Sequence, residues 1–384
     1  MRTITETGGW AKFAGRVEAA TPQNRDRAID GLRALAILGV IVGHFLVMAL
    51  MVDAEGALRV TSPLIHLSGF APLSWVLQML GVFFLVGGYS AAKSWARADG
   101  YLSWAGRRMA RLARPVAAVV AALAVAIPVL ALAGVPAGTL RTTVVLVVQP
   151  LWFIAIYAVI TALTPVAVAM TRRLGAWAAL PGLAVVAAVD LLRYGPGQDA
   201  MPGWLGLVNL LPGWSFAYLL GVAWAHGRLG RRGAALLVTG GAALMLLLVL
   251  RLGYPASMVG VPGTGRTNAH PPSLLVLALA AVQSGFAILL RDRLAALLRR
   301  RPGLWAAVAV ANLSAMTIFC WHQIALMTLS GGAQWAAPGG VPGLHTVPAD
   351  LGWVLARLGW LPVYGMVLGG YVLLARRFEN RPER

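Results

Sequence analysis

The chain has 384 residues, of which 59% are hydrophobic and only 12% are charged, whereas soluble domains carry roughly 25% charged residues. So little polar surface excludes a soluble fold of this length and predicts one membrane domain. The net charge of +19 comes almost entirely from arginine residues, which stand in short runs between apolar stretches. Such runs are typical of the cytoplasmic flanks of membrane helices, so we expect no nucleic-acid partner.

Residues 1–28 hold five basic residues and lack the hydrophobic region of a secretory signal, which predicts a cytoplasmic N-terminal tail. Apolar runs of roughly 20 residues, long enough to cross a bilayer, follow at about 29–52, 72–92, 113–133, 150–170, 176–193, 208–226, 233–252, 272–290, 305–329 and 351–375. We therefore expect an all-α polytopic bundle of about ten transmembrane helices over residues 29–375. Residues 376–384 then form a cytoplasmic C-terminal tail.

The lysine and arginine residues test these spans independently. Most of the 32 fall in the two tails and in alternate loops, with large groups at 93–114 and 291–301. Because basic residues mark the cytoplasmic side, a missed or added helix would have scrambled this alternation. The pattern predicts that both termini are cytoplasmic and that the protein is a multi-pass protein of the cell membrane, surrounded by lipid.

The first span carries three ionisable residues, Asp30, Arg33 and His44. Asp30 precedes Arg33 by about one helical turn, a spacing that permits an ion pair. His44 follows Arg33 by eleven positions, which is about 20° from three full turns and roughly 16 Å along the helix axis. Arg33 and His44 therefore share one face, and His44 lies deep in the hydrocarbon, where an ionisable side chain indicates a polar interior or a cavity.

Later elements add fewer candidates. Asp190 and Arg193 are three residues apart in the fifth span, which predicts a local ion pair. The outer segments 253–271 and 331–350 are rich in Gly and Pro, and they are either binding loops or simple connectors. His322 is the second histidine deep in an apolar run. The single cysteine and the six histidines show no metal-ligand spacing, so we expect no metal site and no permanently bound cofactor.

Five segments resemble, in the same order, motifs of the membrane-bound acyltransferase-3 family. They are Asp30-Gly-Leu-Arg33 with His44, Phe83-Phe84-Leu-Val-Gly-Gly-Tyr89, Arg107-Arg108-Met-Ala-Arg111-Leu-Ala-Arg114-Pro115, Leu151-Trp152-Phe153, and Ser314-Ala-Met-Thr-Ile-Phe-Cys-Trp-His322. The resemblance extends over about 27–330. One departure is Gly87, where the family usually has serine; if that hydroxyl helps catalysis, its task is unfilled here or falls to Ser90 or Tyr89.

The resemblance implies transfer of a short acyl group, commonly acetyl, from an acyl-CoA donor to an acceptor hydroxyl, which is O-acetylation when the group is acetyl. Histidine is the side chain best suited to take the proton of a hydroxyl near neutral pH, so we assign His44 as the general base. Direct transfer and a transient acyl-histidine are both open. Arg33 is the second catalytic candidate, because it can contact the donor or stabilise the thioester oxyanion.

The remaining candidates concern binding. Arg108, Arg111 and Arg114 match the phosphate groups of CoA, although cytoplasmic flanks contain arginine for topological reasons alone. Asp30, Trp152 and His322 are substrate-binding candidates, against the alternatives of a helix cap, an interfacial anchor and a core histidine. The acceptors implied by the resemblance are carbohydrates, cell-envelope glycans and glycosylated metabolites.

A second class of function stays open at this point. A transporter or lipid carrier could use Arg33, His44 and His322 to bind its cargo without bond chemistry, and helix count alone does not separate the two classes. The Arg33–His44 spacing together with the basic segment 107–115 favours the acyltransferase, because a carrier has no need of an acyl-CoA site. The sequence leaves the acceptor, the acyl length and the oligomeric state open.

Overall fold

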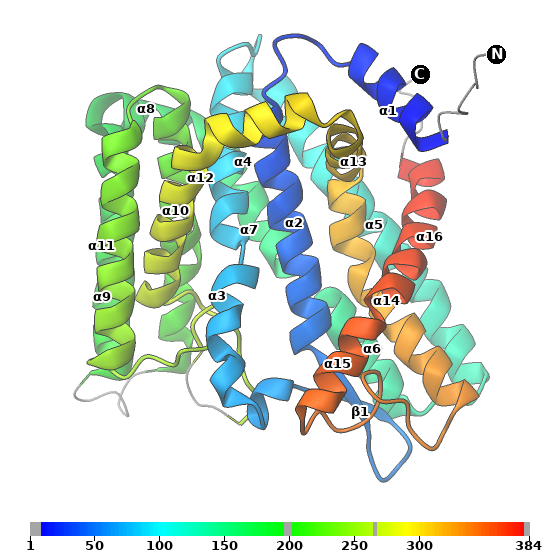
Figure 1. The fold of residues 1–384 in the computed structure, drawn as a ribbon. Helices are drawn as coiled ribbons and strands as arrows, with labels where there is room; N and C mark the ends of the chain where they lie inside the picture. The colour runs from blue at the N-terminus through cyan, green and yellow to red at the C-terminus, as the bar shows by residue number, and fades with distance from the viewer. Residues whose placement is uncertain (1–8, 196–201, 264–266, 380–384) are drawn as a thin grey trace, which may run out of the picture.

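The computed structural model describes residues 9–195, 202–263 and 267–379, so the ends of both predicted tails, 1–8 and 380–384, lie outside the described residues. The chain folds into one helical bundle (Figure 1). The elements of its first half are α1 (Gly9–Ala19), α2 (Arg27–Val47), β1 (Ala49–Val52), β2 (Leu58–Thr61), α3 (Ser74–Leu77), α4 (Leu80–Trp95), α5 (Tyr101–Leu132), α6 (Ala137–Val148), α7 (Leu151–Ala162), α8 (Thr164–Leu174) and α9 (Leu180–Tyr194). Those of its second half are α10 (Leu210–Ala225), α11 (Arg231–Leu250), α12 (Leu274–Arg300), α13 (Pro302–Leu313), α14 (Ala315–Ala336), α15 (Leu351–Gly359) and α16 (Leu361–Glu379).

The number of membrane crossings agrees with the sequence. Within the described residues, eight helical stretches are long and apolar enough to cross a bilayer, and two bent helix pairs raise the number to ten when each pair counts as one span. The pair α13–α14 bends by 78° and the pair α15–α16 by 42°. The prediction of an all-α polytopic membrane bundle is therefore confirmed.

Several predicted boundaries are wrong. The first span ends at Val47, because residues 49–52 form β1, which pairs antiparallel with β2 in a small hairpin. The predicted spans 150–170 and 176–193 are in fact 137–162 and 164–194. Pro165, which has no N–H to donate, lies in the first turn of α8 and so marks the start of a new helix inside one apolar run.

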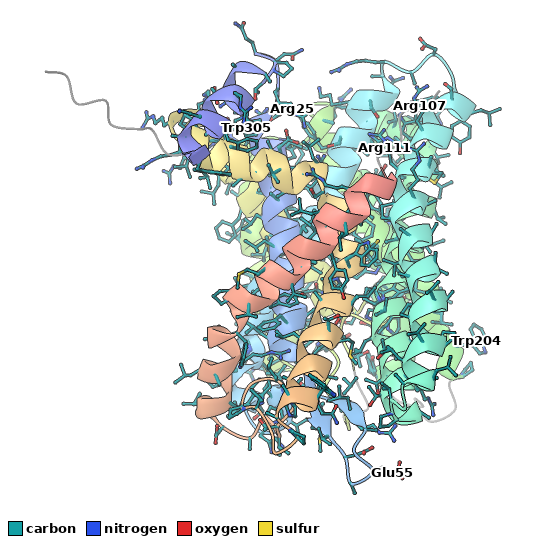
Figure 2. All side chains as sticks on the ribbon, turned by 90° about the vertical axis from the view of Figure 1, so that its right-hand side faces the viewer. Arg25, Glu55, Arg107, Arg111, Trp204 and Trp305 are labelled. Carbon is teal, nitrogen blue, oxygen red and sulfur yellow. The ribbon has the colours of Figure 1, made fainter. Side chains whose placement is uncertain are left out.

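The basic segment after the second span is also helical rather than a loop. Helix α5 begins at Tyr101 and includes the whole arginine-rich stretch 107–114. Figure 2 shows Arg25, Arg107 and Arg111 at one end of the bundle, and Glu55 and Trp204 at the other. We call these the basic end and the opposite end. By the positive-inside rule the basic end is predicted to face the cytoplasm.

The N-terminal segment packs on the basic end. Helix α1 lies against α13, and the indole N–H of Trp305 donates to the hydroxyl of Thr21 at 2.8 Å. The guanidinium of Arg27 lies 4.8 Å from the ring centre of Trp305 and donates to the carboxylate of Glu18. Part of the predicted tail is thus an ordered helix.

Asp190 is buried at the opposite end, but its principal partners are not local. Its carboxylate accepts from the backbone N–H of Leu274 at 2.7 Å, the hydroxyl of Tyr254 at 3.0 Å and the side-chain amide of Asn209 at 3.2 Å. It therefore satisfies an N–H in the first turn of α12, which has no partner within that helix. The predicted ion pair with Arg193 is wrong as the main interaction of Asp190, because the guanidinium of Arg193 lies over the ring of Tyr194 instead.

Two glycines bring α4 and α10 into backbone contact. A Cβ atom on Gly88 would collide with the carbonyl oxygen of Tyr218, and one on Gly221 would collide with that of Leu85. Small residues at such crossings allow membrane helices to approach closely, where van der Waals contact holds them.

Candidate active site

Helix α2 places Arg33 near the basic end of the bundle and His44 in its last turns toward the opposite end. The helix begins after Asp26, whose carboxylate accepts from the backbone N–H of Ile29. Between Arg33 and His44, the side chains of Ala36, Ile37 and Val40 are buried. The two ionisable residues therefore belong to separate polar clusters on one helix, with packed apolar side chains between them.

The Arg33 cluster is an ionic network. The guanidinium of Arg33 donates to the carboxylate of Asp30 at 3.2 Å, the amide oxygen of Asn312 at 3.3 Å and the hydroxyl of Ser90 at 2.7 Å. Asp30 is buried and also binds Arg25, with Nε 2.5 Å from its Oδ2. The predicted Asp30–Arg33 ion pair is confirmed, and the carboxylate of Asp30 is occupied by the two arginines.

Of the three arginines predicted to bind the donor, Arg108 alone joins this cluster. Its guanidinium donates to the backbone carbonyl of Ser90 at 3.2 Å and to the hydroxyl of Ser94 at 2.8 Å. Arg111 and Arg114 are exposed. Around the helix axis, Arg111 is turned by about 60° and Arg114 by about 120° from Arg108, so each lies farther from the face that carries Arg108.

The His44 cluster is a pair of hydrogen-bonded imidazoles. Nδ1 of His44 lies 2.7 Å from Nε2 of His322, which belongs to α14 and is 1% exposed. Nδ1 of His322 lies 2.5 Å from the carbonyl oxygen of Phe319. A carbonyl oxygen can only accept, so Nδ1 of His322 carries the proton and, in the neutral ring, its Nε2 accepts from Nδ1–H of His44. The lone pair of His44 is then on Nε2, the atom that a general base needs.

The amide of Gln323 is a third member of this cluster. Its nitrogen is placed 3.1 Å from Nδ1 of His44 and 2.9 Å from the sulfur of Met48, while its oxygen has no hydrogen-bond partner. With Nδ1 of His44 protonated, the other orientation of the amide turns its oxygen toward that N–H, which it then shares with Nε2 of His322.

His44 lies in the wall of a cavity of about 430 Å³. Trp152, at the start of α7, and His270, in the segment between α11 and α12, form part of the same wall. The rings of Trp152 and His270 meet edge to face, with centres 4.1 Å apart. Most other lining residues are apolar, and Ser62, Gln149 and a few further hydroxyl and amide groups are interspersed, a composition typical of small-molecule sites.

His270 lies outside the membrane-spanning helices. Partial desolvation at the cavity lowers the pKa of its imidazole to about 4. The residue remains exposed on one side, so it belongs to the part of the wall that solvent reaches.

A comparison with known families matches residues 26–377 to the acyltransferase domain of the acyltransferase-3 family. The chain belongs to the acyltransferase-3 family. Comparison with the curated proteins and with the solved structures gave no match. This member is thus a multi-pass membrane acyltransferase, as the five sequence motifs indicated.

In this acyltransferase-3 protein a tyrosine ring fills the space beside Gly87. A Cβ on Gly87 would lie 2.6 Å from Cε2 and 2.7 Å from the hydroxyl oxygen of Tyr157. Of the two expected substitutes for the family serine, Ser90 accepts from Arg33, whereas the hydroxyl of Tyr89 lies 3.3 Å from the carboxylate of Asp26 and belongs to the basic end. Ser90 is therefore the hydroxyl that contacts a catalytic candidate.

The structure brings together residues that the sequence did not connect. His44 and His322 were singled out separately, and the structure makes them one pair. His270 and Gln323 were not predicted; the one signal for His270 was its position in a Gly/Pro-rich outer loop, where binding residues concentrate. No group of three or more His, Cys, Asp or Glu residues within the described ranges could hold a metal ion.

Proposed function

We propose that this membrane acyltransferase moves a short acyl group, acetyl in the simplest case, from acyl-CoA to a hydroxyl of a carbohydrate, a cell-envelope glycan or a glycosylated metabolite. The observation that supports this most strongly is that His44, in the wall of an accessible cavity, is hydrogen-bonded to the buried His322 behind it. A neutral imidazole whose second nitrogen is held by a fixed acceptor is poised to take a proton.

The proposed chemistry conserves atoms and charge at every step. Nε2 of His44 takes the acceptor's hydroxyl proton as the oxygen attacks the thioester carbonyl. The C–S bond then breaks, the CoA thiolate takes the proton from His44, and the products are the O-acyl ester and free CoA. During the step His322 accepts from Nδ1–H of His44 and stabilises the imidazolium, much as a carboxylate does in a catalytic triad. Direct transfer is the simpler route; an acyl-histidine would use the same Nε2 as nucleophile.

The Arg33 cluster supports a role in donor binding. Arg33 and Arg108 converge on Ser90 near the basic end, and arginine is well suited to the phosphate and carbonyl groups of CoA. Arg33 is bound toward Asp30, and Ala36, Ile37 and Val40 separate it from His44. This arrangement favours donor binding by Arg33 over stabilisation of the oxyanion. To reach His44, the pantetheine arm of the donor would have to pass between α2 and a neighbouring helix.

The cavity supports acceptor binding from the opposite end. Trp152 presents an aromatic surface held in place by His270, and aromatic rings with an apolar body contribute much of the contact energy at binding sites. Hydroxyl and amide groups such as those of Ser62 and Gln149 can orient a polyhydroxylated ligand. The carrier alternative has no comparable support, since the family match covers most of the chain.

The direct test uses purified protein with labelled acetyl-CoA and candidate acceptors. His44→Ala should lower the rate of acyl transfer at least about a hundredfold, because a positioned base contributes that much or more. His66→Ala is the matched control, because His66 is exposed at the opposite end of the bundle and should leave the rate unchanged. Normal transfer by His44→Ala would show that the base has been assigned wrongly.

Sidedness is tested in liposomes with protein of known orientation. Donor should be consumed only when supplied on the side of the basic end, and the acceptor should be modified only on the other side. Equal consumption of donor from both sides would refute the arrangement of the two clusters along α2.

A further inference from the structure

Arg357, in α15, is a fully buried arginine whose hydrogen bonds all go to backbone carbonyls. Its guanidinium donates to the carbonyl oxygens of Phe45 at 2.7 Å, Gly343 at 2.8 Å and Met48 at 2.9 Å. The last carbonyls of a helix lack partners within it and carry partial negative charge, which favours a cation there. Arg357 therefore caps the C-terminal end of α2, the end that carries His44.

Tyr364, in α16, reaches the other histidine of the pair. Its hydroxyl donates to the backbone carbonyl of His322 at 3.2 Å. Its ring stacks on Phe45 with centres 4.4 Å apart and planes inclined by 22°, and the guanidinium of Arg357 lies 4.0 Å from the centre of the same Phe45 ring. Phe45, the residue after His44, is thus contacted by both Arg357 and Tyr364.

These contacts connect α2 and α14, which are far apart in the sequence, to the helix pair α15–α16. Figure 1 shows α15 beside the lower end of α2, with α14 and α16 adjacent. The backbone just after His44 and the backbone carbonyl of His322 are each held by a side chain from α15–α16. The proposed acyl transfer gives Arg357 no direct part in the chemistry. A charged side chain in an apolar span is costly, and its presence indicates a function.

We propose that α15–α16 is a brace that sets the distance between His44 and His322, with Arg357 and Tyr364 as positioning residues. The effect on catalysis rests on the proposed role of His44, but the geometric claim does not. Because the imidazole–imidazole hydrogen bond spans only 2.7 Å, a small displacement of either helix end breaks it. Neither residue touches the reacting groups; both act through the histidines.

A structural measurement tests the brace without reference to activity. In protein labelled with ¹⁵N-histidine and held in lipid nanodiscs, nuclear magnetic resonance detects the nitrogen–nitrogen coupling across the His44–His322 hydrogen bond, assigned by its disappearance in His44→Gln. The coupling should be lost in Arg357→Gln and weakened in Tyr364→Phe, which keeps the stacked ring and removes only the hydroxyl. It should persist in Arg251→Gln, an exposed arginine at the same end of the bundle.

Kinetics separates positioning from binding. In Arg357→Gln kcat should fall by up to about a hundredfold, the scale of a misplaced catalytic group, while KM for the donor stays unchanged; Tyr364→Phe should fall less. If Arg357→Gln does not fold, the coupling and the kcat of Tyr364→Phe alone test the brace. Coupling that is unchanged in the brace variants, or absent from the unmodified protein, overturns the brace. Lost coupling with normal acyl transfer would leave the brace standing and refute the catalytic role proposed for the His44–His322 hydrogen bond.

Discussion

The polar groups at the two ends of α2 are stabilised within the membrane protein in opposite ways. At the basic end, Arg33 lies in a network of charges in which Asp30 is shared between two arginines. At the other end, His44 pairs with a second imidazole, and the nearby charge of Arg357 is compensated by backbone carbonyls rather than by a carboxylate. The basic end is held by ion pairs, whereas at the other end neutral side chains and backbone carbonyls are the partners.

The difference matches the two substrates proposed for this protein. A donor that carries several phosphate charges is best met by fixed cations with geometry set by their own ion pairs. A general base must instead stay neutral until it takes a proton, and surrounding it with carboxylates or free cations would bias that equilibrium. The separation of the two clusters by Ala36, Ile37 and Val40 keeps the charges of the proposed donor site away from the proposed base.

The largest effect predicted from this comparison concerns the donor. Arg33→Lys keeps the charge but cannot reach Asp30, Ser90 and Asn312 together, so KM for acyl-CoA should rise about tenfold, as expected for lost charge-assisted hydrogen bonds. Steady-state kinetics with varied donor measures it, and the exposed Arg107→Lys serves as control. A rise in KM for the acceptor with no change for the donor would reverse the assignment of the two ends.

A smaller effect is expected at the acceptor cavity. Trp152→Ala should raise KM for the acceptor about fivefold, through loss of aromatic contact, while KM for the donor stays constant. Trp152→Phe should recover part of the loss. Trp204→Ala, at an exposed tryptophan on the same end of the bundle, should change neither constant. If Trp152→Ala alters only donor kinetics, the cavity does not receive the acceptor.

The smallest effect is a pH dependence of stability. Folding lowers the pKa of His270 to about 4, so between about 6.5, the pKa of an unperturbed histidine, and 4 the unfolded chain binds a proton that the folded chain does not. His270 therefore costs stability as pH falls through this window and costs nothing above it. Because water reaches one side of the ring, the cost should stay well under about 1 kcal/mol. Thermal unfolding at pH 7 and pH 4.5 should show a slightly weaker pH dependence for His270→Gln. An unchanged dependence would show that the imidazole of His270 is not desolvated at the cavity.

Much of the fold could be predicted because hydropathy and arginine alternation report membrane crossings directly. The ten spans follow from apolar length, and their parity follows from the basic loops. The breaks at Pro165 and Ser314 could not be placed, because composition reports that a segment is apolar and not whether its helix bends. The hairpin after Val47 was missed for the same reason, since residues 49–52 are as apolar as the helix before them.

The candidate site was predictable only along α2. Helix periodicity relates Arg33 to His44, but the partner of His44 lies on α14, far away in sequence, and only tertiary packing brings His322 to it. Arg357 could have been found by the argument that singled out His44, because it too is ionisable and lies in an apolar span. Its acceptors are backbone carbonyls, which leave no signature in a sequence.

The glycine crossing of α4 and α10 limits which parts of the bundle can move. The backbones of α4 and α10 touch at Gly88 and Gly221, so no side chains lie between the helices there that could rearrange. Packed interfaces of this kind adopt discrete arrangements rather than sliding continuously, and we expect the two helices to move as one unit. The pantetheine arm of the proposed donor needs room beside α2 and must obtain it elsewhere. The bend at Ser314, between α13 and α14, offers a hinge. The close contact of α4 and α10 therefore favours movement on the other side of α2, in the helix that carries His322.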